Sequence, residues 1–374
     1  MRLHCFITVI LFLACHIGIS QTIPVIPLND AYKKQLTLTT NDFIESITYI
    51  PIETSQSCLI DAGPRIDLTK DQIIITNNNK CLLFDRSSGK FIREIGKYGR
   101  GPSEYQATRG GFFNDLTSNI YFLGWKGNLV KYSLEGKQIG SIPIPNFKDS
   151  FTEPFFPENF NYVDNNSIAC NIFNSLGTQK TLIMIFDEKG KQIGSVPNHN
   201  ITKEHKFSLT TGELRFYHFN DKLLYHHRDN DTIFYITQNK EIPYLIIASG
   251  KSKKSQKSKD EAVFLTNYLE SQRFNFFNFK AAGKEYFSLY DKSNSSLKAI
   301  ELTNGITNTT DNFLPFRPIA IHNEEIVGTI QCTDLISWFE KNPDLKEKLP
   351  QDLKQLSLKQ ATDNPVIVIA KLKK

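Results

Sequence analysis

The sequence predicts an all-β fold, a six-bladed β-propeller with a short helical insertion in its last blade. Three similar segments support this prediction. Each is an apolar strand, a turn that ends in Gly-Lys, and a second strand with alternating side chains, which is the pattern of a β-hairpin. The segments cover residues 82–96, 130–144 and 183–197, and their Gly-Lys pairs begin at residues 89, 136 and 190. A repeat of about 50 residues with about four strands is typical of propeller blades.

A second repeated feature is an arginine that stands six residues before a turn-forming Asp or Asn. It occurs at Arg65/Asp71, Arg109/Asp115, Arg215/Asp221 and Arg317/Asn323. In the fifth unit Arg273 begins the apolar segment RFNFFNF, but the turn comes later, near Gly283. In the third unit Glu158 takes the position of the arginine, six residues before Asp164. Six units are therefore expected to begin near residues 65, 109, 158, 215, 273 and 317.

A propeller of this kind needs a closure, because an open ring leaves strand edges exposed. The strands expected over residues 46–54 and 365–373 are the natural pair, and we predict that they join in one blade. Residues 21–374 then form a single propeller domain. Within the last blade, leucines and aromatic residues at helical spacing predict two short helices over about residues 334–358.

Residues 1–20 have the layout of a secretory signal peptide, with Arg2 before an apolar run over residues 6–14 and small residues near the expected cleavage point. The apolar run is too short to cross a bilayer, and no later segment reaches the ~18 consecutive apolar residues of a membrane span. The protein is therefore expected to be exported, to the periplasm or the cell surface. A lipid anchor at Cys15 is the weaker alternative.

Charge and cysteine content restrict the possible partners. Removal of residues 1–20 takes away one arginine and no acidic residue, so the formal net charge falls from +5 to +4. An excess of this size is no evidence for nucleic-acid binding. Four cysteines remain without CxxC spacing, so no zinc site is expected, and either a disulfide or buried free thiols fit the sequence. They are Cys58, Cys81, Cys170 and Cys332.

No catalytic motif stands out. The sequence contains no P-loop, GxSxG or HExxH pattern, so no catalytic residue and no cofactor is predicted. His226 and His227 are adjacent on an expected strand and therefore point to opposite faces, so they cannot share one metal ion. No metal site is expected.

The segment GKYGRGPSEY, residues 96–105, carries a family resemblance. It resembles the G-x-x-G-x-G-P-x-E-Y element of six-bladed β-propeller proteins that are common among exported proteins of Bacteroidota, which are related in shape to NHL and TolB-type propellers. The ending DNPVIVIAKLK is similar to the closing strand of that family, and the resemblance spans about residues 40–374. It implies the propeller fold and an envelope or extracellular location. Because most members lack an established activity, it implies no catalytic residues.

The arginine register suggests a ligand site at the mouth of the central channel. We expect the side chains at one end of the inner strands to gather there, namely Arg65, Arg109, Glu158, Arg215, Arg273 and Arg317. Several guanidinium groups around one cavity would attract carboxylate, sulfate or phosphate groups. The alternative is structural: each arginine bridges to an acid or carbonyl of the next blade, because joints between blades repeat.

The glycine-rich loop adds three candidate ligand contacts, Tyr98, Arg100 and Glu104, on its polar rim. Glu104 has the alternative role of satisfying amides of the loop itself. Trp125 lies in a turn of the second unit, where an exposed ring could stack on a sugar; packing between blades is the alternative.

These features favour a non-catalytic binding or scaffolding propeller of the cell envelope, which recognises an anionic or carbohydrate ligand or an envelope protein partner. Two alternatives stay open. One is a carbohydrate-active enzyme, a polysaccharide lyase or hydrolase acting on acidic glycans, with His218 as the candidate base of a lyase. The other is a protein-interaction module that uses the lysine-rich segment 251–259 or the helical cap.

Overall fold

The computed structural model describes residues 22–374, apart from residues 35, 78, 147–156, 175, 200, 202–213, 229, 239 and 251–262. The predicted signal peptide and the lysine-rich segment 251–259 therefore lie outside the described residues.

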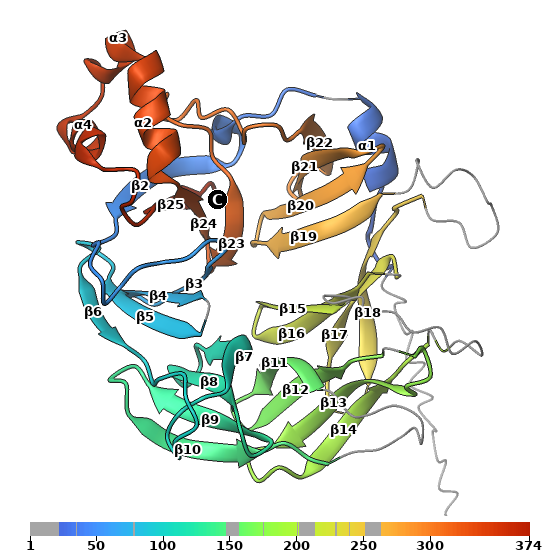
Figure 1. The fold of residues 1–374 in the computed structure, drawn as a ribbon. Helices are drawn as coiled ribbons and strands as arrows, with labels where there is room; N and C mark the ends of the chain where they lie inside the picture. The colour runs from blue at the N-terminus through green and yellow to red at the C-terminus, as the bar shows by residue number, and fades with distance from the viewer. Residues whose placement is uncertain are drawn as a thin grey trace, which may run out of the picture.

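Six β-sheets follow one another around a central channel in the order of the sequence (Figure 1). The first blade contains β3 (Arg65–Leu68), β4 (Gln72–Asn77), β5 (Lys80–Asp85) and β6 (Phe91–Glu94). The second contains β7 (Ala107–Asn114), β8 (Asn119–Gly124), β9 (Asn128–Ser133) and β10 (Gln138–Pro143). The third contains β11 (Pro157–Asp164), β12 (Ser167–Ile172), β13 (Thr181–Asp187) and β14 (Gln192–Pro197).

The fourth blade contains β15 (Leu214–Phe219), β16 (Lys222–His227), β17 (Thr232–Ile236) and β18 (Glu241–Ile247). The fifth contains β19 (Phe264–Glu270), β20 (Phe274–Ala281), β21 (Lys284–Asp291) and β22 (Ser296–Glu301). The sixth contains β23 (Pro318–His322), β24 (Glu325–Ile330), β25 (Val366–Leu372) and β2 (Ile44–Pro51). This arrangement confirms the predicted six-bladed propeller.

Position in the blade decides which residues each strand needs. Second strands lie between two neighbouring blades, so both faces are covered: all six residues of β12 are buried, as are five of the six residues of β4. Outer strands such as β14 are partly open to solvent and keep polar residues. Buried apolar surface between blades is the main favourable term that holds such a ring together.

The repeated Gly-Lys turns have a packing role that explains their spacing. Gly89 and Gly190 both have positive φ, at 68° and 76°, in the turn between the third and fourth strands of their blades. A Cβ at Gly89 would lie 2.2 Å from the carbonyl oxygen of Pro51 in the preceding blade, and one at Gly190 would lie 2.5 Å from that of Pro143. Gly136 approaches Glu94 in the same way, with less crowding. The turn therefore needs glycine both for its backbone conformation and for the close approach of the next backbone.

The ring closes as predicted. β2, from the N-terminal part of the chain, pairs in antiparallel fashion with the C-terminal strand β25, with Thr48 opposite Ile369. Upstream of β2, β1 (Val25–Ile26) adds a parallel strand to β18, and α1 (Leu28–Lys34) places Tyr32 against the aromatic rings of the fifth blade. η1 (Thr40–Asp42) leads into β2. This N-terminal segment thus crosses the outside of the fourth and fifth blades before it completes the sixth.

The helical insertion caps the sixth blade, as expected, but it contains three short helices and a 3-10 turn in place of two helices. They are α2 (Cys332–Lys341), α3 (Pro343–Lys346), α4 (Gln351–Gln355) and η3 (Leu356–Leu358). α2 ends at Lys341 because Pro343, two residues later, has no backbone N–H to continue the hydrogen bonds of the helix. Trp338 and Phe339 pack on Phe313, with ring centroids 4.7 and 5.7 Å away.

One predicted blade start is wrong. The segment RFNFFNF of the fifth blade forms β20, which is the second strand, and the innermost strand is β19. The mistake arose because β20 is almost fully buried and strongly apolar, whereas β19 has no arginine at its start. Arg273 therefore lies in the turn between β19 and β20.

The two ends of the channel can be named from the direction of the inner strands. The start end is the end where the inner strands begin, and the turn end is the end where they turn into the second strands.

Candidate functional site

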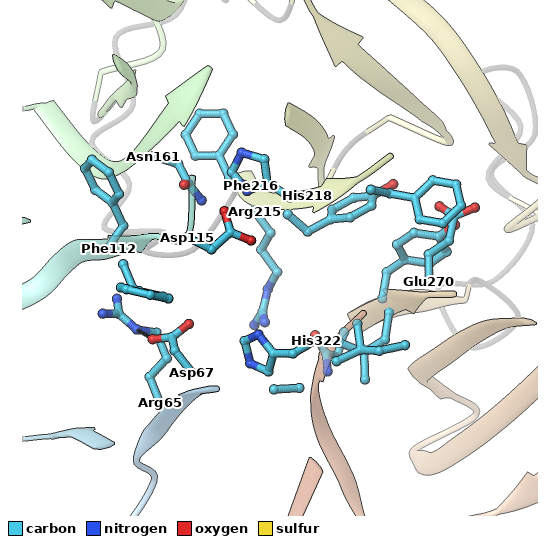
Figure 2. Close-up of a pocket in the computed structure, with 18 of the residues that line it drawn as sticks. Arg65, Asp67, Phe112, Asp115, Asn161, Arg215, Phe216, His218, Glu270 and His322 are labelled. Atoms are coloured by element: carbon cyan, nitrogen blue, oxygen red, sulfur yellow. Dashed lines mark hydrogen bonds and ion pairs between the residues drawn. The ribbon is translucent and has the colours of Figure 1, made fainter. Parts of the chain in front are cut away.

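The central channel contains a cavity of about 750 Å³ (Figure 2). Its walls are residues of the six innermost strands and their turns, from β3, β7, β11, β15, β19 and β23. Aromatic rings and polar groups alternate along these walls, for example Phe112, Asp115 and Tyr162. A cavity of this size and composition is within the usual range for small-molecule sites.

Of the six residues predicted to ring the mouth, the structure brings Arg65 and Arg215 into this cavity. Arg109 is exposed at the start of β7 and does not line it. Glu158 borders a separate small space between the third and fourth blades, beside Asn171 and His227. Arg273 and Arg317 are outside the cavity as well.

Arg273 anchors the end of the chain. Its guanidinium makes an ion pair with Asp291 at 2.7 Å and donates to the backbone oxygen of Lys374, also at 2.7 Å. The hydrogen bonds that Arg273 and, to a lesser extent, Ser293 donate to Asp291 lower its pKa to about 2. Arg317 donates to the carbonyl oxygen of Thr303 at 2.5 Å. Both arginines thus have partners within the protein: Arg273 in its own blade and at Lys374, and Arg317 in the linker between β22 and β23.

Arg65 lines the cavity and also bonds to the neighbouring blade. Its Nε is 3.1 Å from Asp67 on the same strand, and its Nη1 donates to the carbonyl oxygen of Gly111 in the second blade. Its Nη2 is buried and has no hydrogen-bond partner among the described residues. Arg65 therefore joins the first two blades and keeps one donor unused.

Hydrogen bonds of this kind connect the blades at every junction of the ring. Besides the Arg65 contact, five hydrogen bonds cross from one blade to the next. They run from Tyr162 to Asp115, from His218 to the carbonyl oxygen of Tyr162, from the Gln272 side chain to Asn220, from the backbone amide of Gln272 to Glu324, and from His322 to the carbonyl oxygen of Ile66. These side chains of the channel wall therefore hold neighbouring blades together.

His218, the candidate base of a lyase, belongs to this set. Burial lowers the pKa of its imidazole from 6.5 to about 4, so the ring is neutral at pH 7. Its Nε2 donates to the carbonyl oxygen of Tyr162 at 2.9 Å. A general base works best with a pKa near the working pH. These contacts assign His218 to the joint between the third and fourth blades.

Arg215 differs from the other charged groups of the wall. It stands at the start of β15, and Figure 2 shows its side chain extending from the strand into the channel. Among the described residues, its guanidinium has no hydrogen bond and no ion pair. Partial burial lowers the pKa of this group, which stays cationic because its usual value is 12.5. Arg215 and His218 lie three residues apart, so they point to opposite faces of the strand.

A buried carboxylate forms a second polar cluster in the wall, and no sequence pattern indicated it. The Glu270 side chain is 1% exposed and receives hydrogen bonds from Tyr244 at 2.6 Å, Tyr268 at 2.7 Å and Lys292 at 2.6 Å. The four residues come from the inner strand, an outer strand and a turn, so they are close only in the folded ring. The cluster joins the fourth and fifth blades.

The charges of the cavity are separated along the channel. Arg65 and Arg215 are at the start end, whereas Asp115, Asp221 and Glu324 lie at the turn end, all among the lining residues. The expected positive mouth is therefore confined to one end and rests on Arg215, because Arg65 is paired there with Asp67. An anionic group entering the cavity would meet favourable charge at the start end.

The loop residues Tyr98, Arg100 and Glu104 lie outside the cavity. Glu104 accepts a hydrogen bond from the amide of Gly101 at 2.6 Å, which is the alternative role considered for it. Tyr98 and Arg100 are exposed on the loop between β6 and β7.

The described part of the chain also bears on metal sites, disulfides and membrane spans. No group of three or more His, Cys, Asp or Glu side chains is arranged there to hold a metal ion. The four cysteines after residue 21 are all free and buried. None of the described helices has the length and apolar character required to cross a bilayer.

The fold and the cavity define a six-bladed β-propeller with a polar, charge-separated central channel. The chain belongs to the family described as "Domain of unknown function (DUF4934)", whose model matches residues 23–371. No curated protein matches the sequence.

A solved structure shares the overall fold, and more distant ones match the chain loosely. A Bacteroides fragilis protein described as a "Putative exported protein" superimposes with a TM-score of 0.66 and 14% identity, over 91% of this chain and 98% of that one. An aldose sugar dehydrogenase from Streptomyces coelicolor, in its PQQ-bound form, has a TM-score of 0.40 and 10% identity, over 88% and 99%. BamB from Moraxella catarrhalis has a TM-score of 0.31 and 9% identity, over 82% and 71%. The likeness to NHL and TolB-type propellers stays a prediction.

Proposed function

We propose that the protein is an exported propeller of the cell envelope that binds a small acidic ligand, such as a uronic-acid sugar, in its central channel. The observation that carries this proposal is Arg215, a guanidinium in the channel without a partner among the described residues. Arg65 joins two blades, Arg273 bonds to Lys374, and Arg317 bonds within the linker between β22 and β23, so each of these three arginines has a partner in the protein.

A carboxylate would pair with Arg215 through two parallel N–H···O bonds, the geometry that guanidinium groups favour. Such a pair would form inside the channel, where the Arg215 side chain is exposed to solvent, so water screens part of the attraction. Phe216 and Tyr217 line the same cavity and are partly exposed, and the apolar face of a sugar can pack against such rings. The carboxylates at the turn end favour the hydroxyl-rich or cationic part of the ligand there.

Export is supported by the signal-peptide layout of residues 1–20 and by the similarity to a protein described as exported. Mass spectrometry of the mature chain tests it, with an N-terminus near residue 21 as the expected result. An enzymatic function has less support, because the contacts of its candidate base His218 join two blades.

Isothermal titration with trigalacturonate tests the channel site. Arg215→Gln is expected to weaken binding by about 10- to 100-fold, the equivalent of ~1.5–3 kcal/mol for a hydrogen-bonded charge. Arg109→Gln is the matched control, because Arg109 has the same place in the register but does not line the cavity. Equal affinity of the wild type and Arg215→Gln would reject the proposal.

A further inference from the structure

The glycine-rich loop between β6 and β7 builds an exposed surface that is separate from the channel cavity. Its tip meets the turn between β8 and β9, and together they present Lys97, Tyr98, Arg100, Trp125 and Lys126, all of which are exposed. We call these five residues the loop platform. None of them lines the channel cavity.

The loop behind the platform is fixed by many contacts. The hydroxyl of Tyr105 donates to the carbonyl oxygen of Asn79, and that of Tyr132 donates to the carbonyl oxygen of Ser103, both at 2.7 Å. The amide of Gly99 donates to the carbonyl oxygen of Tyr105 at 3.1 Å. The loop therefore loses little conformational entropy when a ligand binds, because its backbone is already ordered.

Two further contacts hold the tip against Trp125. The indole Nε1 donates to the carbonyl oxygen of Gly99 at 2.5 Å. The guanidinium of Arg100 lies 5.1 Å from the centre of the indole ring, within the range of a cation–π contact. Trp125 is nevertheless 44% exposed, and Tyr98 is 55% exposed. The platform thus exposes aromatic surface and a guanidinium, and contacts within the protein fix their arrangement before a ligand binds.

The platform carries an excess of positive charge. Among the described residues, the side chains of Lys97, Arg100 and Lys126 make no ion pair and no hydrogen bond. The carboxylate within the loop, Glu104, is turned toward the amide of Gly101. The three cations beside two exposed aromatic rings therefore outnumber the one carboxylate of the loop, Glu104, which lies against the backbone at Gly99 and Gly101.

We propose that the loop platform is a binding surface for a carboxylated polysaccharide. Arg100 and the two lysines pair with carboxylates along the chain, and the rings of Trp125 and Tyr98 pack against sugar faces. A polymer fits better than a single small molecule, because the platform is an open surface whose charges come from two separate segments of the chain. The site does not depend on the channel site around Arg215.

Trp125 gives a direct readout, since the chain has only two tryptophans and Trp338 is packed between Phe313 and Phe339 in the helical cap. Titration with polygalacturonate is expected to change the tryptophan emission in a saturable way. Trp125→Phe should abolish that signal. Arg100→Ala is expected to weaken binding about tenfold, as for loss of a charge-assisted contact, and salt should weaken the wild type too.

Two control variants separate the platform from the channel site and from general attraction to exposed arginines. Arg93→Ala removes an exposed arginine of β6 outside the platform, and Arg215→Gln removes the channel contact; neither should change the Trp125 titration. Neutral dextran should give no signal. Equal losses in Arg100→Ala and Arg93→Ala, equal binding of dextran and polygalacturonate, or tighter binding to phosphatidylglycerol vesicles than to polygalacturonate would overturn the proposal.

Discussion

The imidazole of His218 lies flat on the phenol ring of Tyr162, with ring centroids 3.8 Å apart and an angle of 8° between the planes. The Tyr162 hydroxyl in turn donates to Asp115, so one chain of contacts joins the second, third and fourth blades. Because the stack buries a group that can take up a proton, it links the stability of the ring to pH.

The pH dependence has a definite direction. The pKa of His218 is about 4 in the folded chain, below its ordinary value of 6.5, so the unfolded chain takes up the proton first as the pH falls. This group therefore destabilises the folded state progressively from about pH 6.5 down to pH 4, by roughly 3 kcal/mol in all, and has no such effect above that window. In urea unfolding at pH 7 and pH 4.5, His218→Gln should lose less stability than the wild type. The same loss in both would contradict the assignment.

The buried ion pair of the fifth blade can be compared with an exposed one. Lys292–Glu270 and Lys284–Glu301 both have N···O distances of 2.6 Å, but the Glu270 side chain is 1% exposed and that of Glu301 is 29% exposed. Lys292→Met leaves a buried carboxylate without its cation, so the free energy of unfolding should fall by about 3 kcal/mol. Lys284→Met should cost much less, because water screens the exposed pair. Equal costs in chemical denaturation would show that burial does not matter here.

Glycine in the repeated turn tests the contact between blades. Gly89→Ala places a Cβ 2.2 Å from the carbonyl oxygen of Pro51 and also forces an L-residue to a φ of 68°. The two effects together should cost about 3 kcal/mol. Gly283→Ala is the control, because its φ is 74° but nothing lies within 4 Å of its Cβ. It should cost about 1–2 kcal/mol. Thermal unfolding of both variants measures the difference, and a control as damaging as Gly89→Ala would refute the packing role.

The cysteines offer a chemical test of the core. Burial raises the pKa of the Cys81 thiol to about 12 and raises that of Cys170 as well. A chain that begins at residue 21 should therefore react with a thiol reagent at pH 8 only after unfolding, and then through four thiols. Fewer than four in denaturant would reveal a disulfide.

Much of the fold could be predicted from the sequence, because each blade repeats a local pattern. The hairpin turns at Gly89, Gly136 and Gly190 and the alternating strands depend on residues close in sequence, and they led to the blade count and the closure by β2 and β25. The start of the fifth blade was predicted wrongly because the burial of β20 depends on neighbouring blades, which a local pattern does not contain.

The site was less accessible to sequence reasoning. Register placed Arg65 and Arg215 at the same end of the channel, but which arginine keeps a free guanidinium depends on partners such as Gly111 and Thr303 in other strands or linkers. The Glu270 cluster has no sequence signature, since its partners are separated along the chain and meet only when the fourth and fifth blades pack together.

The most direct measurement is a crystal structure of the protein soaked with a galacturonate oligomer. We expect a carboxylate of the ligand within hydrogen-bond distance of the Arg215 guanidinium, with sugar density inside the channel. An empty channel at saturating ligand, or an Arg215 side chain held by an acidic residue of the protein, would contradict it.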